Sequence, residues 1–168
     1  MADQRIMQDI AALVPRLRKF ARVMCGNMAD ADDVVQATVE KAMRNIIQYQ
    51  PGTRLDSWLF AIARNHWVDD RRMARNRMPH DDVDAVLDMA GDDGRGVTEG
   101  RDLQRRVRAA VDLLPAEQRE LVGLVMIEGY GYREAADMLG IPIGTVMSRL
   151  SRAKAALAER LAEVGGLA

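Results

Sequence analysis

Apolar residues recur at helical spacing through the first part of the chain. Within residues 10–21 they fall at positions i, i+3, i+4 and i+7, a pattern that predicts a helix with one apolar face. Pro15 lies inside this run, so we expect the helix to begin or to bend at this residue.

Two more helices are predicted before residue 78. Asp30 is placed to cap the first of them, in which apolar residues keep helical spacing as far as Ile47. Turn-forming residues follow at 49–53. The next helix is expected from about Asp56, with Trp67 on its apolar face and a very polar end at residues 69–77.

The last third of the chain repeats the helical spacing. One apolar stripe runs through residues 103–114, and Pro115 is expected to open the next helix in its first turn. A short helix is predicted at residues 133–139, where Gly140 closes it, and a longer helix at residues 145–161.

The last two predicted helices have the proportions of a helix-turn-helix. On the second of them, the positions that face the core are Val146, Leu150, Ala153 and Leu157. A separate polar face is formed by Thr145, Ser148, Arg149 and Arg152, with Lys154 beside it. A basic, polar face at the start of a second helix suits reading of the DNA major groove. The alternative is an ordinary helical hairpin whose basic face is solvated.

Composition supports an all-α fold and narrows the function. Of the 168 residues, 48% are hydrophobic and 29% charged, while only 4% are aromatic. Cys25 is the single cysteine, which excludes a disulfide within the chain, and we expect it to be a buried small hydrophobe. We also expect no membrane helix and no signal peptide.

The net charge of -1 hides three segments of different charge. Residues 1–76 carry 12 basic and 9 acidic residues, and residues 101–168 carry 10 basic and 9 acidic residues. The segment between them, residues 77–100, carries 2 basic and 7 acidic residues and is rich in glycine. We therefore expect two small helical domains, 1–76 and 101–168, joined by a flexible acidic linker, 77–100.

Several motifs resemble those of bacterial sigma factors of the sigma-70 family, in the extracytoplasmic-function (ECF) group. Region 4 is similar to residues 114–121 (LPAEQREL), 132–136 (YREAA) and 140–154 (GIPIGTVMSRLSRAK). Regions 2.1 and 2.2 resemble residues 32–42 (DDVVQATVEKA), and regions 2.3 and 2.4 resemble residues 60–72 (FAIARNHWVDDRR). The motifs stand in the order that this family has, with a linker between them.

The resemblance implies roles for particular residues. It implies that Asp33 and Gln36 dock on the clamp helices of RNA polymerase, with Thr38, Lys41 and Arg44 as further candidates. The residues that it implies for recognition and melting of the -10 element are Arg54, Ser57, Trp58, Arg64, Asn65, Arg71, Arg72 and Arg75. Those that it implies for binding of the -35 element are Thr145, Ser148, Arg149, Arg152 and Lys154. Trp58 either lines a base pocket or belongs to the core, and the last three arginines of the -10 set either hold phosphates or form a solvated helix end.

Two residues depart from the pattern of this family. Ala37 stands where many relatives carry an acidic residue, which removes one expected contact with polymerase. Met147 stands where many relatives carry arginine, which removes a cation from the recognition helix. We expect the second change to alter promoter preference.

The function implied by the resemblance is that of a promoter-specificity subunit and not of an enzyme. Its partners would be core RNA polymerase (clamp helices and flap), promoter DNA and an anti-sigma factor, in the cytoplasm, with no cofactor and no metal. Two alternatives are a stand-alone helix-turn-helix regulator and a sigma-like decoy that binds an anti-sigma factor. The first leaves Asp33 and Gln36 unexplained, and the second leaves Arg149 and Arg152 unexplained.

Overall fold

The computed structural model describes residues 2–77 and 99–165. All the regular secondary structure in these residues is helical. The elements are α1 (Ala2–Cys25), α2 (Met28–Arg44), the 3₁₀ helix η1 (Ile46–Gln48), α3 (Leu55–Arg77), α4 (Glu99–Asp112), α5 (Ala116–Leu121), the π-helix η2 (Val122–Ile127), α6 (Tyr132–Leu139) and α7 (Ile143–Gly165). The all-α prediction is confirmed. The predicted acidic linker falls almost entirely on residues 78–98, which lie outside the described part of the chain.

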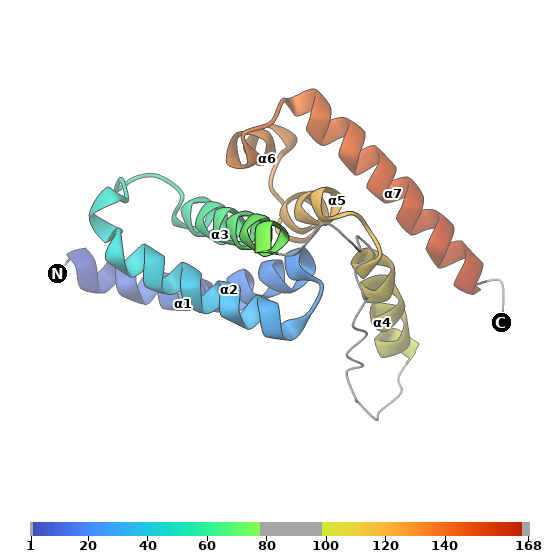
Figure 1. Cartoon of the computed structure of the whole chain (residues 1–168), viewed down its shortest axis with the longest axis horizontal. Helices are drawn as coiled ribbons and strands as arrows, with labels where there is room; N and C mark the ends of the chain where they lie inside the picture. Colours follow the sequence, from blue (N-terminus) through green and yellow to red (C-terminus); the bar gives the residue numbers. More distant parts are fainter. Residues whose placement is uncertain (1, 78–98, 166–168) are drawn as a thin grey trace.

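Two groups of helices lie side by side (Figure 1). Helices α1, α2 and α3 pack together as one group, and α4 to α7 form the other, with α5 in contact with both α1 and α7. The largest core cluster contains buried residues of both groups, such as Phe20 and Phe60 from the first and Leu121 and Leu124 from the second. The two predicted domains therefore share a hydrophobic core in this structure.

Two local details of the N-terminal helices differ from the sequence predictions. Helix α1 begins well before Pro15 and continues through it, so the helix does not start at this proline. The cap of α2 is Asn27 and not Asp30, because the Asn27 side chain accepts a hydrogen bond from the Asp30 backbone N–H at 2.9 Å. Cys25 is buried as predicted, and burial raises the pKa of its thiol to about 12.

Gly123 in η2 lies close to Phe20 of α1, where the two groups meet. An added Cβ at this glycine would lie 3.0 Å from Cδ2 of Phe20, whose ring is fully buried. The π-helical turn around it is marked by the bond from Glu128 N–H to the Gly123 carbonyl at 3.0 Å. Glycine therefore permits an approach of η2 to α1 that a larger residue would prevent.

Candidate nucleic-acid interface

Helices α6 and α7 form the predicted helix-turn-helix. Gly140 ends α6 with a left-handed φ of +65°, which turns the chain toward the start of α7. The small side chains of Ala135 and Ala136 are buried on α6. On α7 the predicted inward positions are all buried: Val146, Leu150, Ala153 and Leu157. The packing face that periodicity predicted for this helix is confirmed.

The five -35 candidates are presented to solvent to different degrees. Thr145 and Ser148 are half-buried, and the Ser148 hydroxyl donates to the Thr145 carbonyl at 3.1 Å. Arg149 leans toward α5, where its Nη2 lies 3.1 Å from Oε2 of Glu117. Arg152 and Lys154 are exposed, and Lys154 reaches the Tyr132 hydroxyl at 3.5 Å. The openly presented cations of this set are therefore Arg152 and Lys154.

Sequence reasoning missed two exposed apolar residues at the start of α7. The side chain of Ile143 is 41% exposed and that of Met147, one turn later, is 52% exposed. Met147 drew attention in the sequence only as a missing arginine. The periodicity of α7 assigns apolar residues to its buried face, so it does not indicate which apolar side chains face solvent.

The loop before α3 is a compact turn. The Tyr49 hydroxyl donates to the Thr53 carbonyl at 2.6 Å, and Gly52 has a left-handed φ of +94° with open space where a Cβ would lie. Trp58 is half-buried, packs against a cluster that includes Leu59, and contacts the Tyr49 ring at a tilt of 44°, with ring centroids 5.4 Å apart. Trp58 thus bridges the loop and the core, and part of its ring is still open to solvent.

Helix α3 separates the other -10 candidates into two sets. Asn65, Arg72 and Arg75 are exposed, whereas Arg71 is half-buried and lies over the Trp67 ring, 5.3 Å from its centroid. Trp67 itself is 7% exposed, which confirms its predicted place in the core. Arg64 points toward the second group of helices, and its side chain is only 26% exposed.

The α2 candidates for polymerase docking share an exposed face, with one exception. Asp33, Gln36, Lys41 and Arg44 are all exposed. The prediction for Thr38 was wrong, because this residue is fully buried and its hydroxyl donates to the Val34 carbonyl at 2.6 Å. A threonine can occupy a core position of a helix when its hydroxyl bonds the preceding turn in this way.

Between the described residues 2–77 and 99–165, four ion pairs join the two groups of helices, and all four have the same polarity. In each pair the arginine comes from residues 2–77 and the carboxylate from residues 99–165. The pairs are Arg16–Glu128 at 2.8 Å, Arg22–Asp112 at 3.2 Å, Arg54–Glu134 at 2.8 Å and Arg64–Glu120 at 3.6 Å. Two of these arginines, Arg54 and Arg64, are predicted to act at the -10 element. Carboxylates of the second group therefore pair with two of the arginines that the sequence predicts to act at the -10 element.

Asp56 strengthens this contact from the side of α3. Its carboxylate lies 3.4 Å from Arg16 and 3.0 Å from Arg54. Burial acts to raise the pKa of Asp56, but hydrogen bonds donated by the Arg54 guanidinium and the Ser57 backbone N–H outweigh it and hold this pKa at about 2. The carboxylate is therefore ionised throughout the neutral range and keeps both arginines in place.

Glu120 is a deeply buried carboxylate among the four pairs. It is 6% exposed, and burial raises the pKa of its carboxyl above the usual value, while the nearby Arg64 acts in the opposite direction. An ionised carboxylate in such a place depends on its counterion. The Arg64–Glu120 pair is thus sensitive to the loss of either partner.

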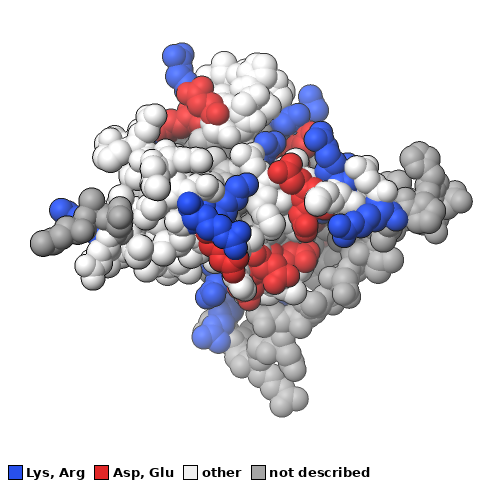
Figure 2. All heavy atoms as spheres, turned by 60° about the vertical axis from the view of Figure 1, so that its left-hand side comes forward, with Lys and Arg blue, Asp and Glu red and all other residues white. Residues whose placement is uncertain are grey.

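Charged groups of both signs adjoin on the surface. On the face drawn in Figure 2, side chains of Lys and Arg lie beside those of Asp and Glu in several groups. Ion pairs also join Arg54, just before α3, to Glu134 of α6, and Arg64 of α3 to Glu120 of α5.

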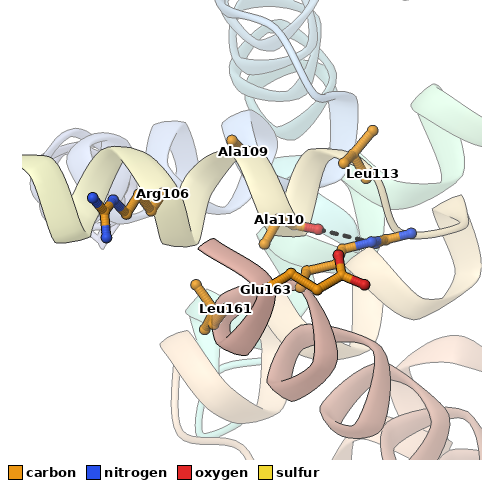
Figure 3. A pocket seen from close by; sticks show the side chains of 7 residues that line it. Arg106, Ala109, Ala110, Leu113, Leu161 and Glu163 are labelled. Carbon is orange, nitrogen blue, oxygen red and sulfur yellow. Dashed lines mark hydrogen bonds between the residues drawn. The ribbon is translucent and has the colours of Figure 1, made fainter. Parts of the chain in front are cut away.

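A shallow apolar groove of about 250 Å³ lies between α4 and α7 (Figure 3). Its lining consists of Arg106, Ala109, Ala110, Leu113, Arg160, Leu161 and Glu163. Arg160 closes one side by donating to the Ala110 carbonyl at 3.3 Å. The small alanines and the single carboxylate of this lining offer no pair of groups for acid–base or nucleophilic chemistry. The groove is a gap in helix packing and not an active site.

Comparison with known proteins decides the family. Residues 10–77 match the family "Sigma-70 region 2", and residues 104–157 match "Sigma-70, region 4". An ECF RNA polymerase sigma factor, EcfG of Rhodopseudomonas palustris, is 39% identical over 156 residues, which are 93% of this chain and 84% of that protein. The chain belongs to the ECF group of the sigma-70 family. Like other members, this sigma factor is a transcription initiation protein and not an enzyme.

Two solved structures share the fold of this sigma factor. The sigma factor RpoE of Bartonella quintana, in complex with the anti-sigma factor NepR, matches with a TM-score of 0.72 and 30% identity, over 94% of this chain and 97% of that one. CnrH in complex with the cytosolic domain of CnrY matches with a TM-score of 0.67 and 27% identity, over 95% and 90% of the two chains. In the described part of this sigma factor, no helix is long and apolar enough to span a membrane.

Proposed function

We propose that this sigma factor directs core RNA polymerase to promoters through two separate DNA contacts. Residues 1–76 would recognise and melt the -10 element, and residues 101–168 would bind the -35 element in the major groove. The observation that carries this assignment is the presence of both sigma-70 regions in one chain, with the helix-turn-helix α6–α7 inside the second. The exposed cations Arg72, Arg75 and Arg152 lie on the helices that each contact would use.

Protein partners follow from the same assignment. The exposed face of α2, with Asp33 and Gln36, is the proposed docking surface for the clamp helices of polymerase. The flap region would hold the second group of helices. RpoE and CnrH are both seen with anti-sigma factors, and we propose such a regulator for this chain. A protein with these partners would work in the cytoplasm.

Engagement of a promoter requires the two groups of helices to separate. In the closed arrangement Glu134 and Glu120 pair with Arg54 and Arg64, so DNA phosphates would have to displace these carboxylates. Binding to polymerase would position the two groups apart, and tethering both DNA contacts to one surface would raise their effective concentration. Weak contacts can then combine into tight promoter binding.

Run-off transcription with purified core polymerase and a promoter library tests the proposed function. We expect promoter-dependent transcripts only when both proteins are present, with little protection of promoter DNA by the sigma factor alone. Tight binding of promoter DNA without polymerase would favour a stand-alone regulator. Binding to an anti-sigma factor with no promoter-dependent transcript would favour the decoy, and either result would overturn the proposal.

Replacing Asn65 with alanine is expected to impair promoter opening. Asn65 is exposed on α3, and its amide can both donate to and accept from the edge of an extruded base. Loss of one such hydrogen bond predicts a fall in transcription of about fivefold to tenfold on duplex promoters. The fall should be much smaller on a template whose -10 element is already melted.

A matched control for this change is Asn76→Ala, which alters another exposed asparagine near the end of α3. We expect this variant to transcribe both templates like the wild type. An Asn65→Ala defect of equal size on duplex and pre-melted templates would show that the residue has no role in opening.

A further inference from the structure

The first two turns of α7 present an apolar surface to solvent. Ile143 and Met147 are four residues apart, so they lie on one side of the helix, and about half of each side chain is exposed. Arg149 points instead toward Glu117 of α5, and Thr145 is half-buried. Within residues 143–149, the exposed side chains are thus those of Ile143 and Met147.

Ile143 and Met147 are only partly covered by the fold. Burial at this end of α7 is provided by Val146 and Leu150. A methionine and an isoleucine in adjacent exposed turns are therefore available for an intermolecular contact. Methionine suits such a contact, because its unbranched side chain adapts to the surface that it meets.

The second helix of a helix-turn-helix places its N-terminal residues against base edges in the major groove. Among the four bases, thymine alone presents a methyl group there, and apolar side chains recognise it by contact. We propose that Met147, supported by Ile143, is a specificity residue that selects thymine methyl groups in the -35 element. This inference rests on the proposed function of α7 as the -35 reader.

The test compares thymine with deoxyuridine, which differs from thymine only in lacking that methyl group. Holoenzyme first selects a strong promoter from a library, and each thymine of its -35 element is then replaced by deoxyuridine. We expect wild-type holoenzyme to lose about fourfold in promoter binding at one or two positions, as the burial of one methyl group predicts. Met147→Ala holoenzyme should bind the thymine and deoxyuridine versions equally.

Two further variants make the test specific. Met126→Ala removes another exposed methionine, 49% exposed and outside α7, and should keep the wild-type preference for thymine. Met147→Arg should lose the preference for thymine and bind DNA with a steeper dependence on salt, by about one phosphate contact.

The outcomes separate this inference from the proposed function. Transcription from the selected promoter, with no position sensitive to deoxyuridine, would overturn the role of Met147 and leave the sigma activity intact. The same holds if Met147→Ala discriminates as well as the wild type. Failure of the holoenzyme to select any promoter would overturn both.

Discussion

Replacing Arg64 with alanine is expected to lower the free energy of unfolding at pH 8 by about 3 kcal/mol. The reason is that Glu120, 6% exposed, then remains buried without its counterion. Burial already raises the pKa of Glu120 above its ordinary value of 4.5, so the folded chain takes up this proton at a higher pH than the unfolded chain. The lost stability should return as the pH falls through that raised pKa toward 4.5. Urea denaturation at pH 8 and pH 5 measures both effects.

Two variants identify the cause of this loss. Glu120→Gln in the Arg64→Ala background removes the buried charge, so it should recover most of the stability at pH 8 and abolish the pH dependence. Arg44→Ala is the control, because Arg44 is 80% exposed in its ion pair with Glu40 at 3.8 Å and should cost less than about 0.5 kcal/mol. A loss at Arg64 no larger than this, or unchanged between the two pH values, would contradict the burial argument.

Replacing Gly123 with alanine is expected to weaken the packing of the two groups of helices by about 1–3 kcal/mol. The new Cβ would lie 3.0 Å from the fully buried ring of Phe20, which is itself held by Phe60 at a centroid distance of 5.0 Å. Electron-paramagnetic distance measurements between labels on exposed Met43 and Glu159 should then show a second, longer distance.

The sign of the Gly123 effect is informative because alanine is the better helix former. Without the clash, Gly123→Ala would stabilise its own segment. Gly100→Ala is the matched control in α4, where no atom lies within 4 Å of the added Cβ, and should leave the label distance unchanged. Phe20→Leu combined with Gly123→Ala should restore part of the packing. An unaltered distance and unaltered stability in Gly123→Ala would refute the close approach.

Local features of the chain were predictable because they depend on neighbours in the sequence. The inward positions of α7, such as Val146 and Leu150, follow from periodicity alone. Gly140 was recognisable as a helix end, because the left-handed backbone conformation that closes a helix is usually adopted by glycine. The family resemblance was also predictable, because motifs in both halves of the chain carry it, and the matches to both sigma-70 regions confirm it.

Features that depend on distant residues were not predictable. Nothing in the local sequence indicates that Arg64 meets Glu120, or that Gly123 of a π-helix receives the ring of Phe20. Thr38 was misplaced because its residue type favours a polar surface, whereas its hydroxyl is satisfied within its own helix. The apolar pair Ile143 and Met147 was hidden by the expectation that a DNA-reading face is polar.

In the four ion pairs between the two groups of helices, the first group always supplies the arginine. This arrangement has a consequence for the response to ionic strength. Dissolved ions screen the pairs that help to hold the two groups together, and they would also weaken the proposed contacts between the freed arginines and DNA phosphates. Under the proposed function the two effects would act on transcription in opposite directions, since one favours the open chain and the other opposes its binding. A rise in salt concentration would then change promoter occupancy less than the number of phosphate contacts implies.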